Sequence, residues 1–109
     1  MASFGAKQSR EGYYLLFDFD NDLNPTDSDG TSLATDSLAS IATVSAYDQN
    51  LGASVASLID TSRNATDSTK AWVWAQNGIS GHSYKITVIV NSNSNAKYEM
   101  DGVLPVRDK

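Results

Sequence analysis

The sequence predicts an all-β domain, a two-sheet antiparallel sandwich of about seven strands. Three observations indicate this class. Asp, Ser, Thr and Asn, which favour turns and caps over helix interiors, occupy 42 of the 109 positions. Several short segments alternate apolar and polar residues, as strands with one buried face do. Turn residues separate these segments at intervals of roughly 10 to 20 residues, which gives six strands and room for a seventh.

The chain begins with a polar segment. Residues 1–11 contain one aromatic side chain among Ser, Gln, Lys and Arg, and are expected to form a flexible N-terminal arm. The single domain then covers residues 12–109, a length that suits one hydrophobic core. Its first strand is expected at residues 12–20, GYYLLFDFD, where Phe17 and Phe19 alternate with aspartates.

The next segments are a loop and two strands. Residues 21–36 contain a proline and an Asp-Gly pair, and are expected to form a long loop or a loop that holds a short edge strand. A second strand is expected at residues 38–47, where alternate residues from Ala42 to Ala46 share one face. A shorter third strand is expected at residues 54–60, SVASLID.

The segment 70–76, KAWVWAQ, predicts a strand with Trp72 and Trp74 on one face and alanine and valine on the other. We expect at least one of these tryptophans to pack in the core between the sheets. The alternative is an exposed platform for a protein partner or a sugar, because aromatic side chains supply contact area at a small entropic cost. Tyr13 and Tyr14 raise the same two alternatives.

Two further strands complete the predicted sandwich. The segment 83–91, SYKITVIVN, shows the clearest alternation in the chain, with Tyr84 and Val90 in the same phase. The last strand is expected at residues 96–106. Because Pro105 has no backbone N–H to donate, this strand is expected to lie at an edge of its sheet or to bulge there.

The residues that precede the clearest strand carry a first resemblance. The segment 74–90, WAQNGISGHSYKITVIV, is a strand end, a turn with glycine, and a tyrosine that opens an alternating strand. It resembles the corner between strands E and F of immunoglobulin and fibronectin type III sandwiches. The resemblance implies that the Tyr84 hydroxyl bonds back across this corner, a structural role that does not indicate a function.

A second resemblance covers residues 16–108. The order is an acidic opening, then DSLASIATVSA, then a tryptophan strand that ends in W-x-x-x-G, then G-x-x-Y-x-I-x-V, and a final Val-Arg-Asp. This order is similar to small virion-associated proteins of tailed bacteriophages and prophages, described as fiber-tail adaptor or tail accessory proteins with an immunoglobulin-like fold. This chain has Asn77 and Gly78 where that family has paired glycines. The resemblance implies a role in particle assembly and brings no catalytic or metal-binding residue.

Composition excludes several functional classes. The chain has no cysteine, which removes disulfides, thiolate metal sites and cysteine nucleophiles. A net charge of −5 at pH 7 repels phosphate backbones, so no nucleic acid partner is expected. No apolar stretch is long enough for a membrane span, and no secretion signal is expected, so the glycosylation sequon at Asn64 should go unused. No cofactor is expected.

Aspartates gather in the segment that follows the first strand. Asp20, Asp22, Asp27 and Asp29 lie close together in sequence, and DSDG faintly resembles part of a calcium-binding loop. The full spacing of such a loop is absent, so these carboxylates are expected to be solvated turn residues rather than metal ligands. With Trp72 and Trp74, they form the candidate interaction surface.

His82 is the single histidine, and it lies among serines in ISGHS. No G-x-S-x-G nucleophile elbow accompanies it, and a domain of this size offers little surface for a cleft with two placed carboxylates. An enzyme is therefore not expected, and His82 is expected to be an ordinary loop residue beside a turn.

These inferences favour a non-enzymatic structural protein of a phage or prophage particle. It would be made in the bacterial cytoplasm, become part of the virion tail or neck, and contact other virion proteins there, with homo-oligomer formation on assembly as an option. The alternative is an immunoglobulin-like recognition module that binds carbohydrate or a cell surface through Trp72 or Trp74 and the acidic loop, with calcium as a further option.

Overall fold

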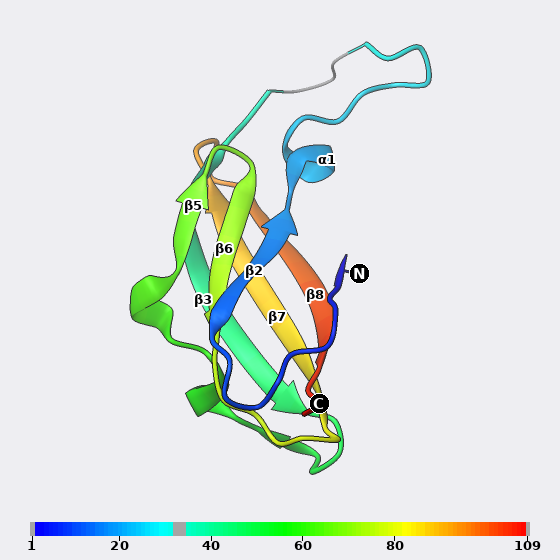
Figure 1. The fold of residues 1–109 in the computed structure, drawn as a ribbon. Helices are drawn as coiled ribbons and strands as arrows, with labels where there is room; N and C mark the ends of the chain where they lie inside the picture. Colours follow the sequence, from blue (N-terminus) through cyan, green and yellow to red (C-terminus); the bar gives the residue numbers. More distant parts are fainter. Residues whose placement is uncertain (1, 32–34, 109) are drawn as a thin grey trace.

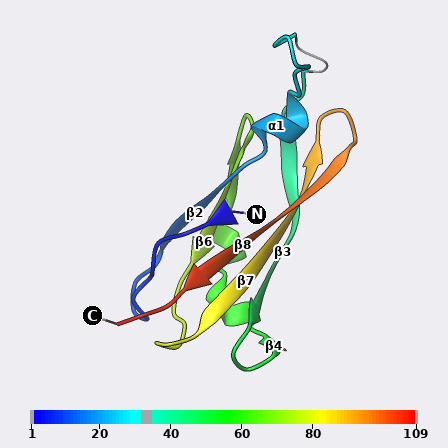
Figure 2. The same cartoon turned by 90° about the vertical axis from the view of Figure 1, so that its right-hand side faces the viewer.

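Alternating apolar residues build a sandwich of two sheets (Figures 1 and 2). The computed structural model describes residues 2–31 and 35–108, and within them eight strands are present. The first sheet has the order β1-β8-β7-β3-β4 and the second β2-β6-β5. The strands are β1 (Ala2–Ser3), β2 (Tyr13–Asp18), β3 (Leu38–Asp48), β4 (Ala53–Ser54), β5 (Ala65–Asp67), β6 (Lys70–Ala75), β7 (Ser83–Ser92) and β8 (Lys97–Pro105).

The strand order confirms the predicted sandwich. Every strand pair is antiparallel except β1 with β8, which is parallel. The sheets β2-β6-β5 and β3-β7-β8 follow the order B-E-D and C-F-G of immunoglobulin sandwiches. The predicted corner is present as well, because the Tyr84 hydroxyl accepts a hydrogen bond of 2.9 Å from the backbone N–H of Ile79.

The core lies between the two sheets and follows from strand alternation. In β7 every second side chain, from Tyr84 to Val90, is buried, as the sequence predicts. The facing sheet contributes Leu15 and Phe17 from β2 and three small residues from β6. The buried apolar side chains are those of Leu15, Phe17, Phe19, Leu23, Leu38, Ala46, Leu58, Ile59, Ala71, Val73, Ala75, Tyr84, Ile86, Val88, Val90, Leu104 and Val106.

The N-terminal segment lies along the sandwich, whereas a free arm was expected. β1 pairs with Gly102 and Val103 of β8, and Lys7 pairs with Val106 further along. Three residues separate Ser3 from Lys7, whereas only Leu104 and Pro105 separate their partners Val103 and Val106. The N-terminal segment therefore bulges opposite Pro105. The prediction that the last strand lies at an edge or bulges at Pro105 is therefore wrong: β8 has neighbours on both sides, its register with β7 is regular through Pro105, and the bulge lies in the N-terminal segment. Sequence alternation did not reveal this packing because it depends on a contact across about a hundred residues.

Two local predictions in the middle of the chain are wrong. Residues 54–60 form the end of β4 and a 3₁₀ helix, η1 (Ala56–Leu58), and not a strand. Leu58 and Ile59 are both buried although they are adjacent, which a regular strand with one buried face does not allow. A second 3₁₀ helix, η2 (Thr61–Arg63), follows, and the short β5 then forms between the predicted segments 54–60 and 70–76, where no strand was predicted.

The second strand is longer and less regular than its sequence suggests. The pairing of β3 with β7 shifts between Leu38 and Ser40 and again between Ile41 and Thr43. Ala42 falls in the second bulge and is exposed, so it does not share the inward face with Val44 and Ala46 as predicted. Ile41 takes the inward position instead.

The segment 21–36 carries no strand assignment within its described residues. It begins in a one-turn helix, α1 (Asp20–Leu23), whose Leu23 is buried under the end of the sandwich. The loop then extends beyond the sheets (Figure 1). Residues 32–34 of this segment lie outside the described residues, so the alternative of a loop that holds a short edge strand is tested only in the rest of it.

Candidate functional site

The outer side of the three-stranded sheet carries an apolar surface built by β2 and β6. We call Tyr14, Leu16, Trp72 and Trp74 the aromatic face. Antiparallel pairing sets Tyr14 opposite Trp74 and Leu16 opposite Trp72, so the four side chains form a compact square. Tyr14 is 46% exposed and Leu16 38%, and both tryptophans are half-buried.

The expectation that a tryptophan packs in the core is wrong. In β6 the buried residues are Ala71, Val73 and Ala75, and the two tryptophans point to the opposite, outer side. Both faces of this strand are apolar, so alternation alone did not decide which one is inside. Phe17, Tyr84 and the aliphatic side chains of β7 already fill the space between the sheets, and only small side chains of β6 fit against them.

The aromatic face is held in place by its own contacts. The Tyr14 ring meets the Trp74 ring edge to face, with centroids 5.0 Å apart, and the Trp72 ring at 6.4 Å. The Arg63 guanidinium lies 4.4 Å from the centre of the Trp74 ring, in cation–π geometry. The Trp74 indole N–H donates to the Gln76 side-chain oxygen at 3.2 Å. These contacts fix the side chains before any partner arrives.

Glycine at position 12 allows the Trp74 indole to lie against the backbone. A Cβ at Gly12 would sit 2.8 Å from a ring carbon of Trp74, closer than side-chain atoms approach one another. The start of β2 therefore supports one edge of the indole. This support and the contact of Arg63 could not be predicted from the sequence, because both depend on residues distant in sequence.

The predicted acidic residues lie elsewhere. Asp20 and Asp22 are exposed on α1, and Asp27 and Asp29 are exposed in the loop that extends past the end of the sandwich (Figure 1). One carboxylate oxygen of Asp27 accepts from the backbone N–H groups of Asp29 and Thr31, each at 2.9 Å. This is a turn-capping role. The structure does not bring these aspartates onto the aromatic face.

Within residues 2–31 and 35–108, no group of three or more His, Asp or Glu side chains is placed to hold a metal ion. None of the helices in these residues has the length and apolar character needed to cross a membrane.

His82 is tied to a buried carboxylate. Its Nδ1 lies 2.7 Å from Oδ2 of Asp48, and the other carboxylate oxygen accepts from the backbone N–H groups of Asn50 and Leu51. Burial raises the pKa of Asp48, but the hydrogen bonds from His82 and from these N–H groups outweigh it, so the pKa lies below its ordinary value. The pair joins the turn after β3 to the corner before β7, which is a structural role.

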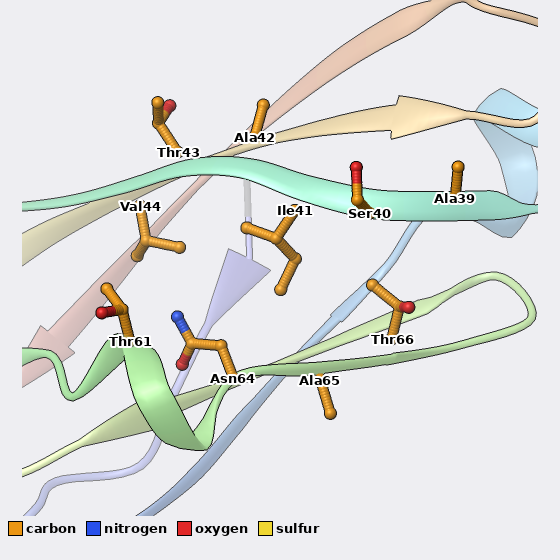
Figure 3. Close-up of a pocket in the computed structure, with 10 residues that line it drawn as sticks. All are labelled: Ala39, Ser40, Ile41, Ala42, Thr43, Val44, Thr61, Asn64, Ala65 and Thr66. Atoms are coloured by element: carbon orange, nitrogen blue, oxygen red, sulfur yellow. The ribbon is translucent and has the colours of Figure 1, made fainter.

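A groove runs between β3 and the segment formed by η2 and β5 (Figure 3). Its volume is about 370 Å³. Ile41 and Val44 point into it from β3, toward Thr61 and Asn64 on the opposite rim, and both aliphatic side chains remain half-exposed. This groove could not be predicted from the sequence, because it forms between β3 of one sheet and β5 of the other.

Comparisons with protein-family models, with curated proteins and with solved structures find no match for this chain.

Proposed function

We propose that this chain is a non-enzymatic structural component of a phage or prophage particle, similar to fiber-tail adaptor proteins, and that it contacts other virion proteins in the tail or neck. The proposal combines the order of motifs over residues 16–108 with one structural observation, the aromatic face. The chain would be made in the bacterial cytoplasm and assembled into the virion.

The aromatic face has the properties of a protein-binding surface. Tryptophan, tyrosine and arginine are the residues that most often dominate binding energy at protein interfaces. Here Tyr14, Trp72, Trp74 and Arg63 lie together and are already ordered by mutual contacts, so binding requires little loss of side-chain freedom. A domain of this kind would add many such contacts in parallel when several copies assemble in a ring.

The first experiment asks whether the protein is part of particles. Density-purified phage from an induced culture of the source bacterium would be searched for this chain by mass spectrometry, alongside the cytosolic and supernatant fractions. We expect stoichiometric recovery with the particles. Absence from particles, with recovery in another fraction, would overturn the proposal.

A matched pair of variants then tests the surface. Tyr14→Ser changes the aromatic face, and Tyr47→Ser changes a tyrosine of similar exposure, 44% against 46%, on the other sheet. We expect the first variant to lose incorporation into particles and the second to keep it. Equal incorporation of the two variants would show that the aromatic face is not the docking surface.

The aromatic face also favours a second candidate, an immunoglobulin-like module that binds carbohydrate or a cell surface. Half-buried indoles stack on sugar rings as readily as on protein side chains. Glycan-array binding that depends on Trp72, together with a change in tryptophan fluorescence on sugar addition, would support it. Unchanged fluorescence and stability with sugars and with millimolar calcium would remove it.

A further inference from the structure

The outer edge of β3 is open over most of its length. β7 pairs with β3 on one side from Leu38 to Asp48, but β4 pairs on the other side only at Tyr47 and Asp48. In the described residues, the segment 39–45 has no strand neighbour on that side. Edge strands present rows of unpaired backbone N–H and C=O groups, which another strand can bind.

The orientation of these groups follows from the neighbouring contacts. The backbone C=O of Ala46 accepts a hydrogen bond of 2.8 Å from the N–H of Val55, on the side of β4. Alternate residues of a strand direct their backbone groups to the same side. The N–H and C=O of Val44 therefore face the open side as well.

The chain itself begins to occupy this position and then leaves it. β4 runs antiparallel to the end of β3, and after Val55 the chain turns away into η1. The place beside residues 39–45 is the continuation of the line of β4. The sheet thus lacks one strand over the length of the groove.

The groove beside this edge selects the kind of segment that fits. Ile41 and Val44 offer aliphatic contacts at its base, whereas the other labelled side chains of β3 point away from the groove (Figure 3). None of the ten residues that line it is charged or aromatic. The complement is an uncharged extended segment with aliphatic side chains on one face.

We propose that the open edge of β3 binds an extended, uncharged segment of another protein, which adds to the sheet as a strand and places aliphatic side chains in the groove. Strand addition of this type gains affinity from backbone hydrogen bonds and specificity from alternate side chains. A single segment fits better than the edge of a second copy, because the two bulges of β3 twist this edge away from regular pairing with a folded strand. The identity of the partner as a virion protein rests on the proposed function, but the strand-addition site itself does not.

The test uses a defined probe, a capped seven-residue peptide of alternating threonine and valine, titrated to millimolar concentration into the full chain and followed by amide NMR. The control is a peptide of the same sequence with every backbone nitrogen methylated, which cannot donate backbone hydrogen bonds. We expect the first peptide to shift the amide signals of residues 39–45 and to slow hydrogen exchange at Val44, and the second to do neither.

Two variants at adjacent positions sharpen the test. Val44→Lys places a charge in the groove. Thr43 lines the same edge, but its side chain points away from the groove, so Thr43→Lys places the charge on the opposite side of the strand (Figure 3). We expect Val44→Lys to weaken binding by about tenfold or more and Thr43→Lys to leave it unchanged. Amide spectra of both variants report whether the fold is kept.

Several results would overturn the proposal: no shifts with the first peptide, equal shifts with the methylated peptide, shifts centred on the aromatic face, or protection of Val44 by self-association without peptide. None of these measurements involves phage particles. Failure here is therefore distinguishable from failure of the proposed function, which is decided by recovery of the chain with virions.

Discussion

Each long side of the sandwich has a gap between the edges of the two sheets, which we call a seam. The two seams are covered by other residues to different degrees. At the seam between β2 and β8, the N-terminal segment covers the gap: the Phe4 ring meets the Phe17 ring at 5.3 Å, and Lys7 is fully buried. At the seam between β3 and β5 nothing in the described residues covers Ile41 and Val44, which remain half-exposed. The N-terminal segment therefore covers one side of the core, and the other side stays accessible to solvent.

The covered seam bears on the stability of the fold, whereas the open seam bears on the strand addition proposed above. A covered seam contributes apolar burial and satisfied polar groups to folding. An open seam gives up part of that burial and keeps backbone groups available for another chain. Four substitutions, two of them followed across pH, test this division and are given in order of decreasing effect.

Phe17→Ala should have the largest effect. Phe17 is completely buried at the covered seam, between β6 and the ring of Phe4. We expect a loss of about 3–5 kcal/mol in the free energy of unfolding, because truncation of a buried aromatic side chain leaves a cavity. Denaturant titration measures it. A loss as small as that of a surface substitution would mean that the covered seam is not a cooperative part of the core.

Lys7→Met should have the second largest effect. The Lys7 ammonium donates to the backbone C=O groups of Gln8 and Asn77, both at 2.6 Å. Methionine keeps the apolar stem but leaves these acceptors without that donor, so we expect a loss of about 1–3 kcal/mol. Hydrogen exchange at residues 2–7 should accelerate in the same variant. Unchanged exchange there would show that Lys7 does not hold the segment in place.

The pH dependence of Lys7 has a definite sign. Burial lowers the pKa of Lys7 more than the nearby carboxylates of Glu11 and Asp108 raise it. The unfolded chain therefore binds more protons at this site as pH approaches the ordinary lysine value, and stability from this group rises with pH in that window. Lys7→Met should remove this rise.

Acid pH should have a smaller effect, through the buried carboxylate of Asp48 at the end of β3. The pKa of Asp48 is lower in the folded chain than its ordinary value near 3.9. Its contribution to stability is thus present above that value and is lost as pH falls through the folded pKa. We expect the free energy of unfolding to fall less steeply with acid in Asp48→Asn than in the original chain. An identical acid dependence in both proteins would contradict this role.

Ile41→Ala should have the smallest effect. The same truncation at a buried site costs about 2–5 kcal/mol, but Ile41 is already half-exposed at the open seam, so we expect about 1 kcal/mol or less. Denaturant titration beside Phe17→Ala gives the direct comparison of the two seams. A cost equal to that of Phe17→Ala would show that the seam between β3 and β5 is closed in solution.

Much of the fold could be predicted from local patterns. The strands β2, β6 and β8 lie within predicted segments, and β3 and β7 each extend one residue past theirs, because alternation with period two is set by backbone geometry and needs no knowledge of neighbours. The hydroxyl contact of Tyr84 was implied by the resemblance of residues 74–90 to an immunoglobulin corner, and it is present. The short β5 and the turn of η1 could not be predicted, because their formation depends on pairing with β6 and on burial of Leu58 beside Ile59.

Less could be predicted from the sequence about the candidate sites than about the strands. Trp72 and Trp74 were singled out correctly as one face of one strand, but which face points to the core depended on the side chains across the sheet. The acidic residues from Asp20 to Asp29 were found by composition, yet their carboxylates are exposed and in part used in turns.

The all-β class, the approximate positions of the long strands and most of the residues that share a strand face follow from periodicity and turn chemistry along the chain. Three features follow only from packing between the sheets: β6 presents its small residues to the core, the N-terminal segment covers one seam, and in the described residues β3 keeps an open edge at the other. These features depend on the space left between two sheets and on contacts between distant residues, which no local pattern encodes.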